Sequence, residues 1–412
     1  LTEGGDLAAV AAPLVVNGRL DTAGGDITGT TTLGMTGGSL DTGAGTYFLG
    51  GTVTGSSSTV TATIGGNLDL GGTSRSFSIA DNATADPDME ISATVTNGTL
   101  SKAGAGQLRL SGTTANTADA TVSGGTLYLS KPAGVDAVGS GGLTVTGGTV
   151  TLEANEQIPD GATLSLSGGT FNTGAGLTET VDTLRMANNH TLAGTGAITA
   201  ANLVADVTNA TQSGGTTTVN LTGDYTRANT SGTVTWNAPI TLMSDGIDNA
   251  HSFTQAAAGV SAFAGPIGGA GATVNIAGGG TITFSGSAPN TYDGLTTVSG
   301  GTLTLNKTAG AIAIGSGGLA VTGGTVYFQA SDQIDSAAAV TASGGTLNLG
   351  AAAVTNTVSS LTMTDSFTLS NAGILNVTSL ASVLSADATQ SGAGRLALTG
   401  DYTGTTGGAT AT

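Results

Sequence analysis

The sequence predicts an all-β fold, a parallel β-helix or β-solenoid, and three observations support this class. The chain of 412 residues is a tandem duplication, and each copy has a finer period of about 20–23 residues. Apolar residues alternate with polar ones, as they do in half-buried β-strands. Gly-Gly pairs recur between these alternating segments, in a chain that contains 70 glycines.

The duplication is visible as matching segments that are separated by a constant shift. TVSGGTLYLSK, from Thr121 to Lys131, returns as TVSGGTLTLNK, from Thr297 to Lys307, a shift of 297 − 121 = 176. LTGDYT at 221–226 returns at 398–403, a shift of 177, so one residue of drift accumulates between the copies. The same shift of 176 carries Gln157-Ile158 onto Gln333-Ile334.

These matches divide one continuous solenoid into three parts. We predict leader coils at 1–88, a first repeat unit at 89–264 and a truncated second repeat unit at 265–412. A repeat at a fixed period indicates the fold more strongly than local secondary-structure propensity does.

The finer period is marked by the second glycine of successive Gly-Gly pairs. Gly125, Gly148 and Gly169 give steps of 23 and 21 residues, and the second copy repeats both steps at Gly301, Gly324 and Gly345. Steps of this size suit one coil of a β-solenoid, which buries its apolar face only against its neighbours. Glycine is favoured at the corners because they require positive φ or a close backbone approach.

Local patterns agree with strands. In Leu143–Val145 and Thr149–Leu152, apolar residues alternate with threonine, the period of a half-buried strand. No helix-length pattern is present; the nearest, Asp248 to Gly259, is short and rich in alanine. The recurring Asp224-Tyr225 predicts a turn with an aromatic cover.

Composition excludes several classes of protein. With 27 acidic and 9 basic residues the net charge is −18, which repels phosphates, so nucleic acid is not a predicted partner. The chain has no cysteine, so it has neither disulfides nor thiolate metal sites. No stretch approaches the roughly 18 apolar residues of a spanning helix, so no transmembrane segment is predicted.

Several segments together carry a family resemblance. In the first copy they are MEISATVTNGTLSKAGAGQLRLSG, from Met89, and the TVSGGTLYLSK that follows. In the second copy they are GTITFSG at 280–286, NTYDG at 290–294 and TTVSGGTLTLNK. These segments resemble the autotransporter-associated β-strand repeat of bacterial passenger domains. The first copy retains only Asn116 to Asp119 of the middle segment and lacks the tyrosine.

The resemblance implies a right-handed parallel β-helix that is secreted or displayed on a bacterial cell surface. Such repeats occur in adhesins, in surface fibres and beside appended enzyme domains, so they indicate fold more strongly than function. We therefore expect an extracellular structural or adhesive protein, a rigid β-solenoid rod that is not itself an enzyme.

One acidic group is a candidate metal site. Asp81, Asp86, Asp88 and Glu90 lie close together in SIADNATADPDME and could supply oxygen ligands to calcium. The segment lacks the Gly-Gly-x-Gly-x-Asp repeat of calcium-binding solenoids, so a solvated loop is the alternative. We predict no other cofactor.

No catalytic residues are predicted. The two histidines, His190 and His251, lack a neighbouring acid and nucleophile in any known motif. Asp332 and Asp335 correspond to Glu156 and Pro159 of the first copy, a pattern that favours a corner loop over a site. The alternatives are a β-helical polysaccharide lyase or hydrolase, which needs converging carboxylates, and a glycan-binding passenger with exposed aromatic residues.

Two kinds of partner fit this interpretation. The open β-edges of a solenoid are templates for another strand, so the chain could polymerise head to tail. The apolar leader at Leu7–Leu20 could be buried by such a neighbour. The other kind of partner is a ligand on a host or cell surface, or in the surrounding matrix.

Overall fold

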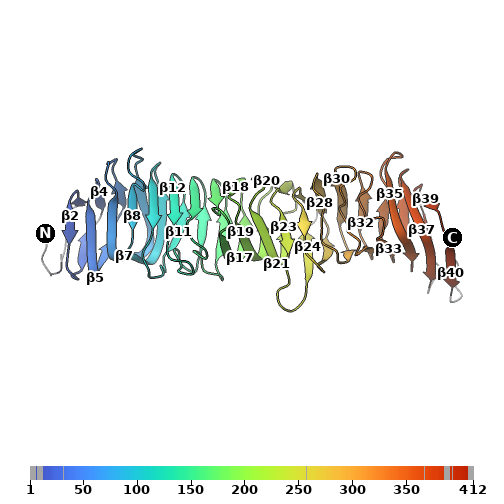
Figure 1. Cartoon of the computed structure of the whole chain (residues 1–412), viewed down its shortest axis with the longest axis horizontal. Coiled ribbons are helices and arrows are strands. Elements are labelled where there is room, and N and C mark those ends of the chain that lie inside the picture. Colours follow the sequence, from blue (N-terminus) through green and yellow to red (C-terminus); the bar gives the residue numbers. More distant parts are fainter. Residues whose placement is uncertain are drawn as a thin grey trace. The chain divides into compact units, whose positions relative to one another are not determined.

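The computed structural model describes residues 6, 13–30, 32–256, 258–365, 367–384, 390–391 and 393–406, and every regular element within them is a β-strand. The chain divides into two compact units, Leu1–Thr199 and Ala200–Thr412. In each unit, parallel strands stack as turns of a β-solenoid, about 18 turns in all (Figure 1). The predicted fold class is confirmed, whereas its right-handedness and the predicted divisions after residues 88 and 264 stay predictions.

The strands are 2 to 18 residues long, and the division of the sequence at residues 199 and 200 falls within β19. The first unit contains β1 (Leu14–Val16), β2 (Arg19–Asp21), β3 (Ile27–Thr30), β4 (Leu33–Met35), β5 (Ser39–Leu49), β6 (Val53–Gly55), β7 (Ala62–Ile79), β8 (Met89–Ile91), β9 (Thr94–Ala103), β10 (Gln107–Leu110), β11 (Asp119–Val122), β12 (Thr126–Leu129), β13 (Leu143–Val145), β14 (Thr149–Leu152), β15 (Thr163–Leu166), β16 (Thr170–Asn172), β17 (Thr178–Met186), β18 (His190–Ala193) and β19 (Ala197–Ala205).

The second unit continues with β20 (Ala210–Ser213), β21 (Thr218–Arg227), β22 (Thr233–Trp236), β23 (Ile240–Leu242), β24 (Ala250–Gln255), β25 (Val260–Phe263), β26 (Ile267–Gly268), β27 (Thr273–Gly278), β28 (Thr281–Gly286), β29 (Thr296–Val298), β30 (Thr302–Lys307), β31 (Leu319–Val321), β32 (Thr325–Phe328), β33 (Ala339–Ala342), β34 (Thr346–Asn348), β35 (Thr355–Met363), β36 (Phe367–Ser370), β37 (Ile374–Leu384), β38 (Gln390–Ser391), β39 (Arg395–Leu398) and β40 (Tyr402–Thr406).

Apolar side chains fill the interior of the turns, as the alternation predicts. In β13 and β14, Leu143, Val145, Val150 and Leu152 are buried, while the threonines between them are half-buried. Successive side chains of a strand point to opposite faces, so this alternation places one row inside and one outside. In the second unit, Tyr225, Trp236, Phe253, Phe263 and Phe284 form a buried aromatic cluster.

The strand register repeats in the two copies. Thr126 of β12 pairs with Thr149 of β14, and Thr302 of β30 pairs with Thr325 of β32, so both partners shift by 176. Further along, β15 pairs Thr163 with Thr183, whereas β33 pairs Ala339 with Ser360. The later partners differ by 360 − 183 = 177. The second copy therefore has one more residue at the corner between β34 and β35, which corresponds to the corner between β16 and β17 in the first copy.

The apolar leader is described only in part. Residues 7–12 of the predicted segment Leu7–Leu20 lie outside the described residues. Within the remainder, Val16 and Leu20 are buried and Val15 is 62% exposed. The hypothesis that a neighbouring subunit covers this segment stays a prediction.

Candidate functional site

Two of the four predicted calcium ligands are hydrogen-bonded to other parts of the chain. Asp88 is buried, and its two carboxylate oxygens accept hydrogen bonds from the backbone N–H groups of Asn82 and Gln107, both at 2.8 Å. Glu90 accepts a hydrogen bond from Ser111 Oγ at 2.6 Å, and Asp81 and Asp86 are exposed. Within the described parts of the chain, no three acidic or histidine residues form a group that could hold a metal ion.

The histidines and the recurring tyrosine lie in strands. His190 is buried at the start of β18, and burial lowers its pKa to about 4. Both ring nitrogens of His251 lie near oxygens: Nδ1 is 2.7 Å from Gly223 O and Nε2 is 3.1 Å from Asn249 Oδ1. Asp224-Tyr225 lies inside β21, and Tyr225 is fully buried, so the predicted turn at this position is wrong. The side chain of Tyr225 lies in the core because it occupies an inward-facing position of that strand.

Four of the nine basic residues are buried and bind backbone carbonyls. Lys102 Nζ donates to the carbonyl oxygens of Ala103, Gly104 and Gly124 at 2.9 to 3.1 Å. Burial lowers the pKa of Lys102, Lys131 and Lys307 to about 8 in each case. The fourth is Arg227, whose guanidinium group is enclosed by carbonyls at another corner.

Lys131 and Lys307 occupy equivalent positions and make equivalent contacts. Lys131 Nζ donates to Ser111 O and Thr114 O at 2.8 and 2.7 Å. Lys307 Nζ donates to Ser285 O and Ala288 O at 2.9 and 2.8 Å. Each ammonium therefore ties the end of one strand to the loop of the preceding turn.

An interior amide extends this connection to the following turn. Gln157 Oε1 accepts from Lys131 N at 2.8 Å, and its Nε2 donates to Lys131 O at 3.2 Å. Gln333 makes the same pair of bonds to Lys307 at the same two distances. Buried polar groups that satisfy one another in this way specify a unique packing of adjacent turns.

At the next turn the two copies differ. Glu179 is fully buried, and its two carboxylate oxygens accept from Gln157 N and Ile158 N, both at 2.9 Å. The second copy has Asn356 here, and its Oδ1 accepts from Gln333 N at 2.7 Å. Burial is the main cause that raises the pKa of Glu179 to about 8; the charges of Glu156 and Asp136 act in the same direction, and the hydrogen bonds from Gln157 N and Ile158 N act against it.

This carboxyl makes stability of the first unit depend on pH. Because its pKa is about 8 in the folded chain and near its usual 4.5 when unfolded, its contribution is complete below the unfolded value and is lost as pH rises through about 8. Between about pH 5 and pH 8 we expect Glu179 to remove a few kcal/mol of stability, at about 1.4 kcal/mol per pKa unit, measured as the difference in urea unfolding from a variant without this carboxyl, because the lowered pKa of His190 changes the stability of both proteins in the opposite direction. Glu179→Gln, which keeps the shape without the titration, is that variant. Equal slopes for the two proteins would contradict this assignment.

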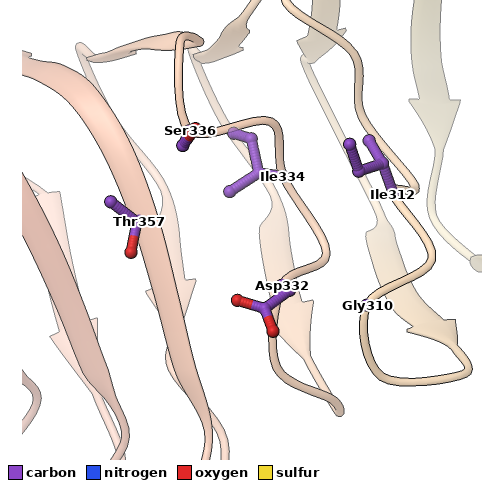
Figure 2. Close-up of a pocket in the computed structure, with 6 residues that line it drawn as sticks. All are labelled: Gly310, Ile312, Asp332, Ile334, Ser336 and Thr357. Carbon is purple, nitrogen blue, oxygen red and sulfur yellow. The ribbon is translucent and has the colours of Figure 1, made fainter.

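A surface pocket of about 360 Å³ lies in the second unit (Figure 2). Figure 2 shows Asp332, Ile334 and Ser336 on one turn, Gly310 and Ile312 on the preceding turn, and Thr357 on the far side. The turns are fixed by backbone bonds from Ala313 N and Ile314 N to Gln333 O and from Asp332 N to Thr355 O. The corner loop predicted around Asp332 is confirmed, and this loop supplies half of the lining.

The equivalent residues of the first copy have different chemistry. The shift of 176 places Asp136, Glu156 and Asp160 where the second copy has Ile312, Asp332 and Ser336. Glu156 is held locally, because its two oxygens accept from the backbone N–H and the hydroxyl of Thr180 at 2.9 and 3.2 Å. The second copy thus has Ile312, Asp332 and Ser336 at three positions where the first copy has only acidic residues.

Sequence reasoning did not identify the buried ionisable residues, although a signal for them was present. Lys131 continues the row of inward-facing positions that holds Leu127 and Leu129, and Glu179 stands in the same inward-facing row as Val181. A charged residue in the inward phase of a strand therefore predicts a buried contact between turns.

No protein-family model matches this chain, and no characterised protein or solved structure shows significant similarity to it. The structure therefore establishes the fold, and the repeat motif remains a resemblance. No helix capable of crossing a membrane occurs among the described residues.

Proposed function

We propose that this chain is an extracellular structural or adhesive protein of a bacterial cell surface, in which the stacked turns are the functional element. One observation carries the proposal: the connection from Lys131 to Gln157 is repeated at Lys307 and Gln333 with the same atoms. Both lysines and both glutamines are used here to hold one turn to the next.

The repeat resemblance supports the location. Segments similar to passenger-domain repeats, such as NTYDG at 290–294, occur in proteins that are exported and displayed. We therefore propose secretion or surface display, with a second copy of the chain or a surface or matrix ligand as partner.

Two measurements, one on intact cells and one on the secreted protein, test the proposal. Protease added to intact cells should release fragments of the chain if it is displayed. Incubation with neutral and acidic polysaccharides should release neither reducing nor unsaturated ends. Release of such ends would overturn the proposal in favour of a lyase or hydrolase, and protection of the chain in intact cells would overturn the location.

Electron microscopy of the secreted material identifies the kind of partner. Filaments with an axial repeat of one chain length would show that the partner is another copy of the chain. Separate particles at the same concentration would contradict head-to-tail assembly and leave a surface or matrix ligand as the partner.

A further inference from the structure

We propose that the pocket lined by Gly310, Ile312, Asp332, Ile334, Ser336 and Thr357 binds one pyranose residue of a neutral or amino-sugar glycan. This inference rests on the proposed adhesive function and assigns a ligand class to it. At about 360 Å³, the pocket falls at the small end of the range for ligand sites, roughly 300–1,000 Å³.

The lining is amphipathic in the way that a sugar ring is. Ile312, which is half-buried, offers apolar surface for the C–H face of a pyranose, and the buried Ile334, only 3% exposed, lines the pocket beside it. The Asp332 carboxylate accepts hydrogen bonds from ligand hydroxyl or amino groups, and the hydroxyls of Ser336 and Thr357 both donate and accept. Figure 2 shows these polar groups on both sides of Ile334.

The negative charge at the pocket determines which glycans we expect it to bind. Asp332 is exposed at the pocket, and the chain carries a net charge of −18. Both disfavour a uronic acid or a sulfated sugar, since like charges repel at close range. A neutral hexose, an N-acetylhexosamine or a free hexosamine meets no such repulsion.

The first copy supplies an internal control. Its equivalent position has Asp136 in place of Ile312, which removes the apolar surface, and Glu156 in place of Asp332 is already bonded to Thr180. We therefore expect one site per chain rather than two.

Methyl NMR of isoleucine-labelled full chain tests the proposal directly. We expect N-acetylglucosamine, its oligomers and galactose to shift the Ile312 and Ile334 methyl signals, with a Kd in about the millimolar range for a single sugar. The signal of Ile158, the first-copy equivalent of Ile334, should not move. Glucuronic acid should shift neither pocket signal at the same concentration.

Two variants sharpen the test. Ile312→Asp, which copies the residue of the first repeat, should abolish the shift at Ile334 while the remaining methyl spectrum confirms an intact fold. Asp332→Asn should weaken binding about tenfold, because it replaces a charged acceptor with a neutral one.

The pocket assignment is overturned if no sugar moves these methyls, if Ile158 responds equally or if glucuronic acid binds as well. Those results would leave the structural role intact, since that role fails only if the chain cleaves polysaccharide or is not displayed.

Discussion

Replacing Arg227 with lysine is expected to lower the free energy of unfolding of the second unit by about 3 kcal/mol or more, since each buried polar group left unpaired costs about 1–3 kcal/mol. Arg227 is 2% exposed. Its Nη2 donates to the carbonyl oxygens of Val207, Thr208 and Ser231 at 3.0, 2.8 and 2.6 Å.

The other terminal nitrogen of Arg227, Nη1, donates to Val260 O at 3.0 Å and to Gln255 Oε1 at 3.1 Å. Lysine keeps the charge but places all its donors on one nitrogen, so it cannot reach both sets of acceptors. Several buried carbonyls at this corner would lose their partner.

Arg75→Lys is the matched control. Arg75 also donates to backbone carbonyls, to Leu70 O at 2.8 Å and Gly50 O at 2.7 Å, but it is only half-buried. Water can replace the lost donors there, so we expect a change within about 0.5 kcal/mol. Urea unfolding of both variants, followed by far-UV circular dichroism, measures the difference. Equal losses would show that enclosure of the Arg227 guanidinium does not decide the effect.

The sequence is sufficient to predict the turns of this fold but not the contacts between them. Alternation in Thr149–Leu152 and glycine pairs such as Gly147-Gly148 are local signals, and the structure confirms both. The partner of a side chain on the next turn lies about 20 residues away, and the pattern of one turn does not identify it. For this reason the roles of Gln157 and Gln333 were missed although their repetition was noticed.

The acidic loop illustrates the same limit. Asp86, Asp88 and Glu90 are neighbours in sequence, which suggested a shared metal site. In the structure Asp88 binds the N–H of Gln107, which belongs to the next turn, while Glu90 bonds to Ser111 on that turn. Stacking therefore supplies partners for Asp88 and Glu90 that their order along the chain does not identify, and the calcium site stays a prediction.

The motif residues behind the family resemblance have structural roles here. Asn290 Oδ1 accepts from Ile267 N at 3.0 Å, and its Nδ2 donates to Ala313 O at 2.8 Å. Tyr292 is buried, with its hydroxyl 2.8 Å from Thr296 Oγ1. In the first copy, Asn116 makes the bonds equivalent to those of Asn290 although the tyrosine is absent there. The asparagine thus connects three turns in both copies, which accounts for its retention.

Gly125→Ala is expected to destabilise the first unit by about 2–4 kcal/mol. Gly125 has a φ of +63°, a left-handed conformation that costs an L-residue about 1–2 kcal/mol. A Cβ at this position would also overlap the carbonyl oxygen of Gly106 and lie 2.5 Å from that of Gly104. Because those carbonyls belong to the preceding turn, relieving the overlap requires the two turns to separate, and overpacking of this kind adds about 1–3 kcal/mol.

Gly124→Ala, one residue earlier, separates these causes from a general effect of losing glycine. Gly124 is not among the residues with positive φ, and a Cβ there would lie 3.4 Å from Gly104 O, close to ordinary contact. We expect a change within about 0.5 kcal/mol, or a small gain, because alanine restricts the unfolded chain more than glycine does. Urea midpoints of the two variants give the comparison. An equal loss of stability in both variants would show that the corner depends on the flexibility of the glycine pair. A loss in Gly125→Ala alone would show that the second glycine is required because the turns stack at van der Waals distance. That requirement explains why the second glycine marks the repeat.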